Sequence, residues 1–209
     1  MSVSIFYSAI PVESSLYQRL QTERALMLLM ERLFPYGNGI FHFFEIEPAE
    51  VDEILSDVIE GHQNILGSES ETTAWIDEFR EEIRRTREAY PGIEDRSTML
   101  ESIARIERRL SQKLAEQQVE NASERVRRLI EGVQNFAPHL SSEDYRFGMM
   151  SVPLSLVQED ARLLREIDPD TLFAEQEDEG RYYRDQFMWL RNLYLEAAER
   201  NEEILILIE

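Results

Sequence analysis

The segment YGNGIFHFFEIEP, residues 36–48, combines side chains that could do chemistry. It places His42, one of three histidines, close to Glu45 and Glu47. A histidine beside carboxylates can act as a general base or hold a metal ion. Strand alternation, however, puts His42 on one face with three apolar residues and Glu45 on the other face. This pattern favours a hydrogen-bonded residue at the edge of the core. The alternative is a small-ligand pocket near His42 that includes Glu47.

A second group of candidate residues is the aromatic set near the C-terminus. It consists of Tyr182, Tyr183, Phe187, Trp189 and Tyr194. At helical spacing such a set is typical of a core-facing stripe. Trp189 lies off the stripe that runs from Tyr183 to Tyr194, which places it near a groove or a subunit contact. Tyr183 and Trp189 are therefore the candidate ligand-binding residues of this helix.

Motifs that carry known chemistry are absent from the sequence. No glycine-rich GxGxxG or GxxxxGK[ST] loop occurs, and no GxSxG nucleophile turn occurs. The histidines His42, His62 and His139 lie too far apart for an HExxH-type metal site, and the chain has no cysteine. Asp57 and Glu60 precede His62 closely, but a helix that ends at a glycine explains this better. The sequence thus predicts no catalytic residue, no metal site and no cofactor.

The net charge of the chain restricts its partners. It carries 42 acidic and 22 basic residues, which gives a formal charge of -20. This field repels phosphate backbones and anionic membranes, so we expect neither nucleic acid nor membrane as a partner. It could attract a basic partner, although solubility is the favoured explanation. Residues 67–132 differ from the rest, because their 15 acids and 12 bases nearly balance.

The elements that position these residues alternate between strands and helices. The expected strands are 3–10, 39–46, 145–152 and 203–208, with helices at 13–33, 48–60, 153–165 and 181–200 and a short helical turn at 167–173. The last strand, EILILI, is so apolar that we expect it inside the sheet rather than at an exposed edge. The order indicates an α+β fold, with a small sheet of about four strands covered by helices.

Residues 67–132 are predicted to form an antiparallel helical hairpin. The first helix covers 70–90, and a second helix begins at Ser97 and continues to Gly132, with a break near 121–123. Its apolar stripe must pack either on the main domain or on another subunit. We therefore expect one core domain made of residues 1–66 and 133–209, with the hairpin as an insertion.

The C-terminal third resembles a known family. Its segments MSVPLSLVQEDARLLREIDPDTLF and FMWLRNLYLEAAERNEEILILI, together with the opening MSVSIFYSAI, are similar to the YfbM-like family of uncharacterised bacterial proteins. The resemblance covers roughly 130 residues at the two ends of the chain. It implies an α+β fold of bacterial origin, and it implies no activity. Typical members lack the segment at about 65–132, in agreement with an insertion.

Three functions are consistent with the sequence. The leading hypothesis is a non-catalytic protein-interaction or regulatory module, which binds a partner protein or a second copy through the helical hairpin. The alternatives are an acidic inhibitor or immunity protein that binds a basic partner, and a small-ligand binder with its pocket near His42. The chain has no apolar run long enough to span a membrane and no signal peptide, so a cytoplasmic location is expected.

Overall fold

The computed structural model describes most of the chain outside residues 34–68. The described residues are 4–33, 69–101, 103–143, 146, 148–173 and 178–208. The strand predicted at 39–46 and the helix predicted at 48–60 lie outside them, as do His42 and Glu47.

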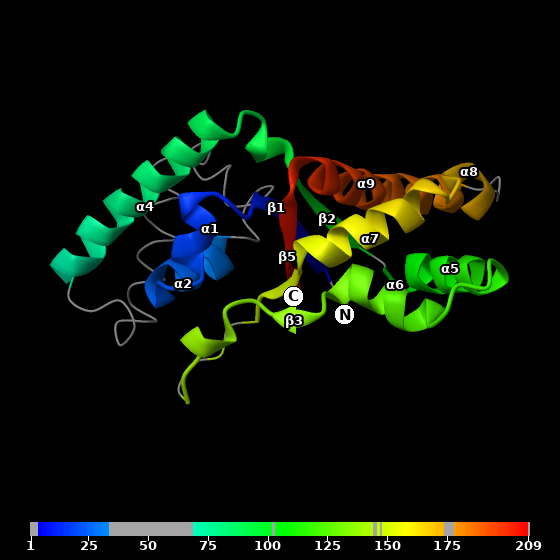
Figure 1. Ribbon diagram of the computed structural model, residues 1–209, viewed down its shortest axis with the longest axis horizontal. Helices are drawn as coiled ribbons and strands as arrows, with labels where there is room; N and C mark the ends of the chain where they lie inside the picture. Colours follow the sequence, from blue (N-terminus) through cyan, green and yellow to red (C-terminus); the bar gives the residue numbers. More distant parts are fainter. Residues whose placement is uncertain are drawn as a thin grey trace.

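An antiparallel sheet forms the centre of the described structure. Its strands are β1 (Ser4–Pro11), β2 (Ser97–Glu101), β3 (Gln134–Asn135), β4 (Met150–Val152) and β5 (Glu202–Ile208). They are arranged in the order β2-β1-β5-β4-β3, and every pairing is antiparallel. The prediction for the C-terminal strand is confirmed, because β5 lies between β1 and β4 (Figure 1). Both its faces are covered, which explains why residues 204–208 are all apolar.

Helices cover both faces of this sheet (Figure 1). On one side lie α1 (Ser15–Leu20), α2 (Arg24–Leu33) and α4 (Glu69–Ala89). On the other side lie α5 (Ile103–Glu116), α6 (Ala122–Glu131), α7 (Leu154–Arg165), α8 (Pro169–Leu172) and α9 (Asp178–Arg200). The fold is therefore α+β, as predicted.

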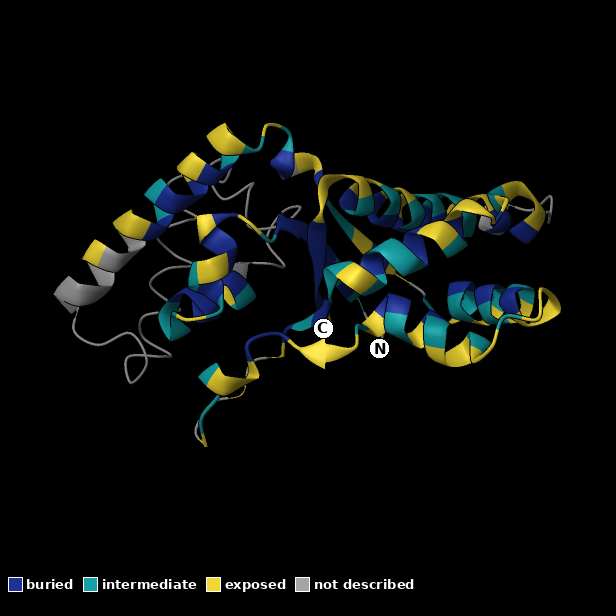
Figure 2. Cartoon of the chain, viewed as in Figure 1, coloured by how far each residue is buried: buried dark blue, intermediate teal, exposed yellow. Residues whose placement is uncertain are grey.

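Strand alternation divides the core into two hydrophobic clusters. Leu205 and Leu207 of β5 pack with α1 and α2, whereas Ile204 and Ile206 pack with the α7 and α9 layer. All four side chains are buried. Figure 2 shows the central strands β1 and β5 as mostly buried, with the exposed helix faces turned outward. Successive residues of β5 thus serve opposite layers, and a polar substitution at any of the four would enter a core.

The helix predicted from Ser97 is wrong over residues 97–101, which form the edge strand β2. In β2, Thr98 pairs with Tyr7 and Leu100 pairs with Ile5 of β1. Leu100 fits a helical stripe and a strand equally well, and the unpaired edge of β1 decides between them. Residues 67–132 therefore contribute a strand to the central sheet as well as helices.

An antiparallel helical hairpin does occur after β2, formed by α5 and α6. The connection between them contains Gln118 and Asn121 with positive φ angles of 59° and 55°. The apolar stripe of the hairpin packs inside this chain, and its buried members are Ile106, Leu110, Leu114, Val126, Leu129 and Ile130. The stripe was predicted to pack either on the main domain or on another subunit, and the structure shows that it packs on the main domain.

Two buried tyrosines form hydrogen bonds with the C-terminal turn of α6. The Tyr7 hydroxyl donates a hydrogen bond to the Ile130 carbonyl at 2.8 Å, and the Tyr194 hydroxyl donates to the Leu129 carbonyl at 2.7 Å. Burial raises the pKa of both phenols well above the ordinary value of 10.0. Both therefore remain neutral donors over the physiological pH range. They satisfy carbonyls in the last turn of α6, where intrahelical donors run out.

Other predicted elements differ only in their limits. The helix predicted over 13–33 is divided into α1 and α2 by residues 21–23, and the strand predicted over 145–152 is limited to Met150–Val152 in β4. The predicted turn at 167–173 is α8, where the Asp168 side chain accepts a hydrogen bond from the Asp170 amide at 3.1 Å. Asn201, with φ at 57°, ends α9 as expected.

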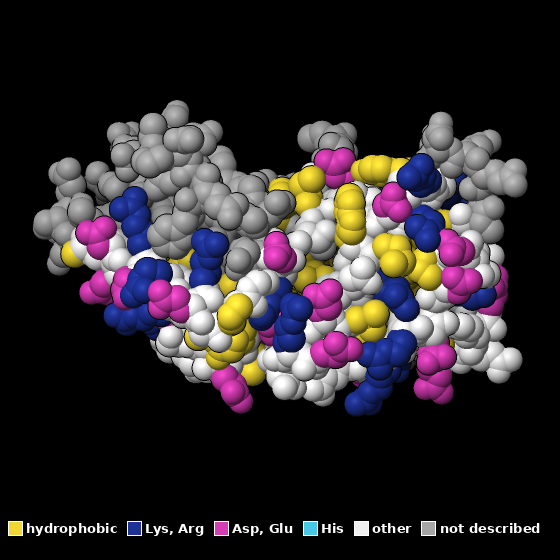
Figure 3. All heavy atoms as spheres, turned by 90° about the horizontal axis from the view of Figure 1, so that it is seen from above, with side chains coloured by type: hydrophobic (Ala, Val, Ile, Leu, Met, Phe, Trp, Pro, Cys, Tyr) yellow, Lys and Arg dark blue, Asp and Glu magenta, His cyan; other side chains and the backbone are white. Residues whose placement is uncertain are grey.

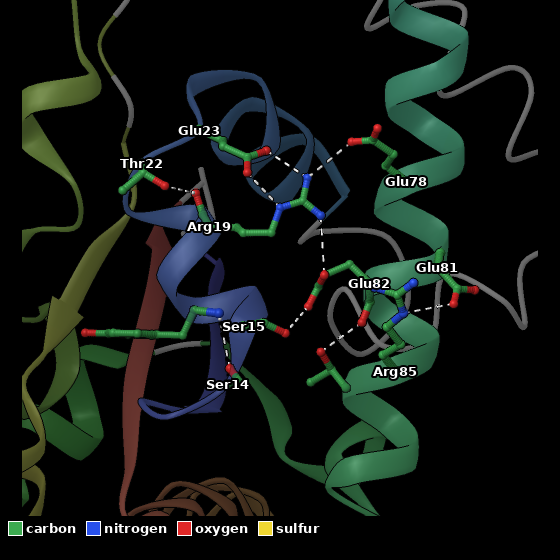
Figure 4. A network of polar contacts seen from close by, with 11 residues as sticks. Ser14, Ser15, Arg19, Thr22, Glu23, Glu78, Glu81, Glu82 and Arg85 are labelled. Atoms are coloured by element: carbon green, nitrogen blue, oxygen red, sulfur yellow. Dashed lines mark hydrogen bonds and ion pairs between the residues drawn. The ribbon is translucent and has the colours of Figure 1, made fainter.

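A polar network joins α1 to α4 on the side of the sheet that α1, α2 and α4 cover (Figure 4). The Arg19 guanidinium lies between three carboxylates, with Glu23 at 2.7 Å and Glu82 at 3.3 Å. Glu82 is buried and also accepts a hydrogen bond from the Ser15 hydroxyl. Because Arg19 connects Glu23, beyond the end of α1, with Glu78 and Glu82 of α4, we interpret this network as structural.

Candidate functional site

A groove of about 620 Å³ lies between the edge strand β2 and helix α9. Residues from β1, the start of β5 and the turn before β2 complete its lining. Binding sites for small groups and side chains commonly have volumes of about 300–1,000 Å³. The groove stands on regular elements packed against the core, so its walls are held in place by the fold.

Large hydrophobic side chains line the groove and remain exposed to solvent. Trp189 is 52% exposed, Tyr182 is 41% exposed and Met99 is 39% exposed. Tyr182 and Trp189 are seven residues apart on α9, so they lie on the same helix face about 10 Å apart along its axis. Figure 3, seen from above, shows hydrophobic side chains among charged ones on this region of the molecule. Exposed aromatic residues in a concave surface are typical of binding sites.

A buried ion pair forms part of the groove's base. The Arg96 guanidinium contacts the Glu202 carboxylate, and the two side chains are 9% and 1% exposed. Arg96 also donates to the Pro91 carbonyl at 3.1 Å. Within the described residues, Arg96 Nε and Glu202 Oε2 have no hydrogen-bond partner. Burial raises the pKa of Glu202, and the charge of Arg96 opposes this rise.

Hydrogen bonds tie β2 to α9 at one end of the groove. The Glu101 amide donates to Gln186 Oε1 at 3.0 Å, and Gln186 is buried. The Tyr182 hydroxyl donates to Glu101 Oε2 at 3.2 Å. Burial, and then this bond to Glu101, raise the pKa of Tyr182. These contacts fix the spacing between strand and helix, and they place a carboxylate beside an exposed aromatic ring.

The predicted site residues have different positions in the structure. Trp189 lines the groove, in agreement with its place off the core stripe. Tyr183 packs against the hydrophobic core, and the Arg105 guanidinium lies 4.7 Å from its ring centre. Tyr182 contacts Tyr183 edge to face, with ring centres 5.5 Å apart. Tyr183 thus supports a groove residue rather than lining the groove. His42 and Glu47 lie outside the described residues, so the pocket predicted there stays a prediction.

Three residues of the groove were not predicted from the sequence, namely Arg96, Gln186 and Glu202. The two charged residues are separated by 106 positions, and no motif connects them. A usable signal was available for Glu202, since it begins a strand whose other members are almost all apolar. A carboxylate at such a position needs a buried partner of opposite charge.

A second cavity, of about 460 Å³, lies between α6 and α7. Arg128 in its wall pairs with the buried Asp160, and Arg125 pairs with Glu159 at 2.8 Å. These pairs hold the hairpin against α7. We therefore interpret this cavity as a structural junction.

In the part of the chain that the structure describes, no group of three His, Cys, Asp or Glu side chains is arranged to hold a metal ion. None of the helices described there is both long and apolar enough to cross a membrane.

Comparison of the chain with models of protein families, with curated proteins and with solved structures gives no match. The resemblance to the YfbM-like family therefore stays a prediction.

Proposed function

We propose that this protein is a non-catalytic interaction module that binds an extended segment of a partner protein in the groove between β2 and α9. The observation that carries this proposal is Trp189, which is half exposed in the wall of a groove built from regular elements. Exposing an indole to water is unfavourable, and covering it with a partner is a common source of binding energy.

The position of β2 favours an extended partner segment. In the described sheet β2 is an end strand, paired with β1 on one side. The Glu101 amide donates to Gln186 of α9, so it points away from β1. Because alternate residues of a strand point their backbone groups the same way, the amide and carbonyl of Met99 also point outward. A partner segment can add to this edge as a further strand while its side chains contact α9.

The hairpin of α5 and α6 is less suited to this role than the groove. Its apolar residues are buried against the core and are not available to a partner. Among the described residues, three of the five exposed large hydrophobic side chains, Met99, Tyr182 and Trp189, instead lie on β2 and α9. We therefore move the proposed partner surface from the hairpin to the groove.

Selection from a library of displayed random peptides against the full chain tests this proposal. Enriched peptides should bind the Trp189→Ala variant at least about tenfold more weakly, as is typical for a central aromatic residue of an interface. Val133→Ala provides a matched control, because Val133 is a hydrophobic residue 46% exposed that lies away from the groove. If Trp189→Ala and Val133→Ala bind the enriched peptides equally well, or if no peptide is enriched, the proposal is wrong.

A further inference from the structure

We infer that the bound segment presents an arginine or lysine side chain to the aromatic end of the groove, between Trp189, Tyr182 and the Glu101 carboxylate. This inference rests on the function proposed above and adds the chemistry of the partner.

The charges around the groove favour a cationic occupant. Four acidic and two basic residues contribute to its lining. Both arginines have acidic partners, since Arg96 pairs with Glu202 and Arg200 pairs with Glu196 at 3.1 Å. The ion pair at the base is neutral as a unit, so the rim sets the sign of the potential. Two further acids of the rim, Asp95 and Glu101, are exposed.

The aromatic residues at the Glu101 end of the groove suit a guanidinium or ammonium group. A cation over the face of an indole or phenol ring is attracted by the ring's quadrupole, and tryptophan gives the strongest attraction. A cation–π contact of this kind already occurs on α9, where the Arg105 guanidinium lies over the ring of Tyr183. At Tyr182, the hydrogen bond to Glu101 holds a carboxylate beside the ring. A cation placed there gains both interactions.

Other head groups fit this end of the groove less well. An anion would meet the Glu101 carboxylate together with the field of a chain whose net charge is -20. A neutral apolar group would cover the rings, but it would also remove water from carboxylates without replacing the lost hydrogen bonds. Only a cation compensates the negative charge of the Glu101 carboxylate when binding removes water from it.

Three probes that share one ring test the sign of the head group. Benzamidinium, benzamide and benzoate are titrated separately into the full chain, and binding is followed through the indole N–H signal of Trp189 in a nitrogen-correlated NMR spectrum. The chain has two tryptophans, so the Trp189→Phe variant identifies this signal by its loss. We expect benzamidinium to bind about fivefold more tightly than benzamide, with benzoate the weakest.

The Glu101→Gln variant tests the role of the carboxylate. Glu101 is exposed and keeps its backbone bond to Gln186, so the fold should be unaffected. The variant should lose about two- to fivefold in benzamidinium affinity and none for benzamide. Glu116→Gln on α5 is the control, because Glu116 is also exposed but does not line the groove.

Equal affinities of the three probes, tightest binding of benzoate, or no shift of the Trp189 signal with any probe would overturn the inference. The same holds if Glu101→Gln leaves the preference for benzamidinium unchanged. Its failure is distinct from that of the proposed function. Enriched peptides that lack basic residues but depend on Trp189 would uphold the interaction groove and reject the cationic partner.

Discussion

The ion pair between Arg96 and Glu202 predicts a large loss of stability when only one partner is removed. Arg96 directly precedes β2 and Glu202 is the first residue of β5, so the pair connects the turn before β2 with β5 at the groove. Arg96→Met keeps most of the side-chain volume and removes the charge. It leaves the Glu202 carboxylate, which is 1% exposed, without a counter-ion.

The magnitude of this loss follows from the burial of both groups. Removing one member of a buried ion pair typically costs about 3–5 kcal/mol, because the remaining charge stays desolvated. Replacing both members by apolar residues is often neutral or stabilising by about 1–4 kcal/mol. We therefore expect Arg96→Met to lower the free energy of unfolding by about 3 kcal/mol or more. The double variant Arg96→Met/Glu202→Leu should recover most of this loss.

The pH dependence of Arg96→Met has a definite sign. Burial already raises the pKa of Glu202 above its ordinary value of 4.5, and Arg96 opposes the rise. Without Arg96 this folded-state pKa is higher still, so the folded state binds the proton more tightly than the unfolded state does. The contribution of that proton to stability is complete below about pH 4.5 and is lost as pH rises through the folded-state pKa. The deficit of the variant should therefore be larger at neutral pH than in acid.

Urea unfolding of the full chain, followed by circular dichroism, measures these differences. Arg165→Met is the matched control, because Arg165 faces Glu199 at 3.5 Å in a pair that is 56% and 69% exposed. Exposed pairs contribute at most about 1 kcal/mol. If Arg96→Met costs no more than Arg165→Met, or if the double variant is no more stable than Arg96→Met, the pair is not a buried counter-ion contact and the reasoning fails.

Two further predictions concern buried polar groups. Tyr7→Phe and Tyr194→Phe should each lower the free energy of unfolding by about 1–3 kcal/mol, since each leaves a buried carbonyl of α6 without its donor. Tyr182→Phe is the control, because its hydroxyl is exposed. It should change the free energy of unfolding by less than about 0.5 kcal/mol in the same urea titrations. Glu203→Gln should raise the melting temperature at neutral pH. Burial raises the pKa of Glu203 above 4.5 even though Tyr17 donates a hydrogen bond to it, so the wild-type stability falls as pH rises through the folded-state pKa. An advantage of Glu203→Gln that is equal at acidic and neutral pH would contradict this.

The sequence by itself determined the elements whose patterns are local. The run EILILI indicates a strand inside the sheet, because an apolar strand at an open edge would offer unpaired backbone groups to another chain. The stripe from Tyr183 to Tyr194 has helical spacing, and Asp168 followed by Pro169 is a helix start whose capping bond forms within two residues. In each of these cases the stabilising contact lies within one element or depends on its own periodicity.

The tertiary structure alone decided the groove. Residues 97–101 become a strand because β1 offers an edge to pair with, and this choice is not made by their own propensities. Arg96 meets Glu202 across 106 positions, and Gln186 meets Glu101 across 85. Such contacts depend on which strands become neighbours, a property of the whole sheet. The sequence could place Trp189 outside the core, but only the packing of α9 against β2 places it in a groove.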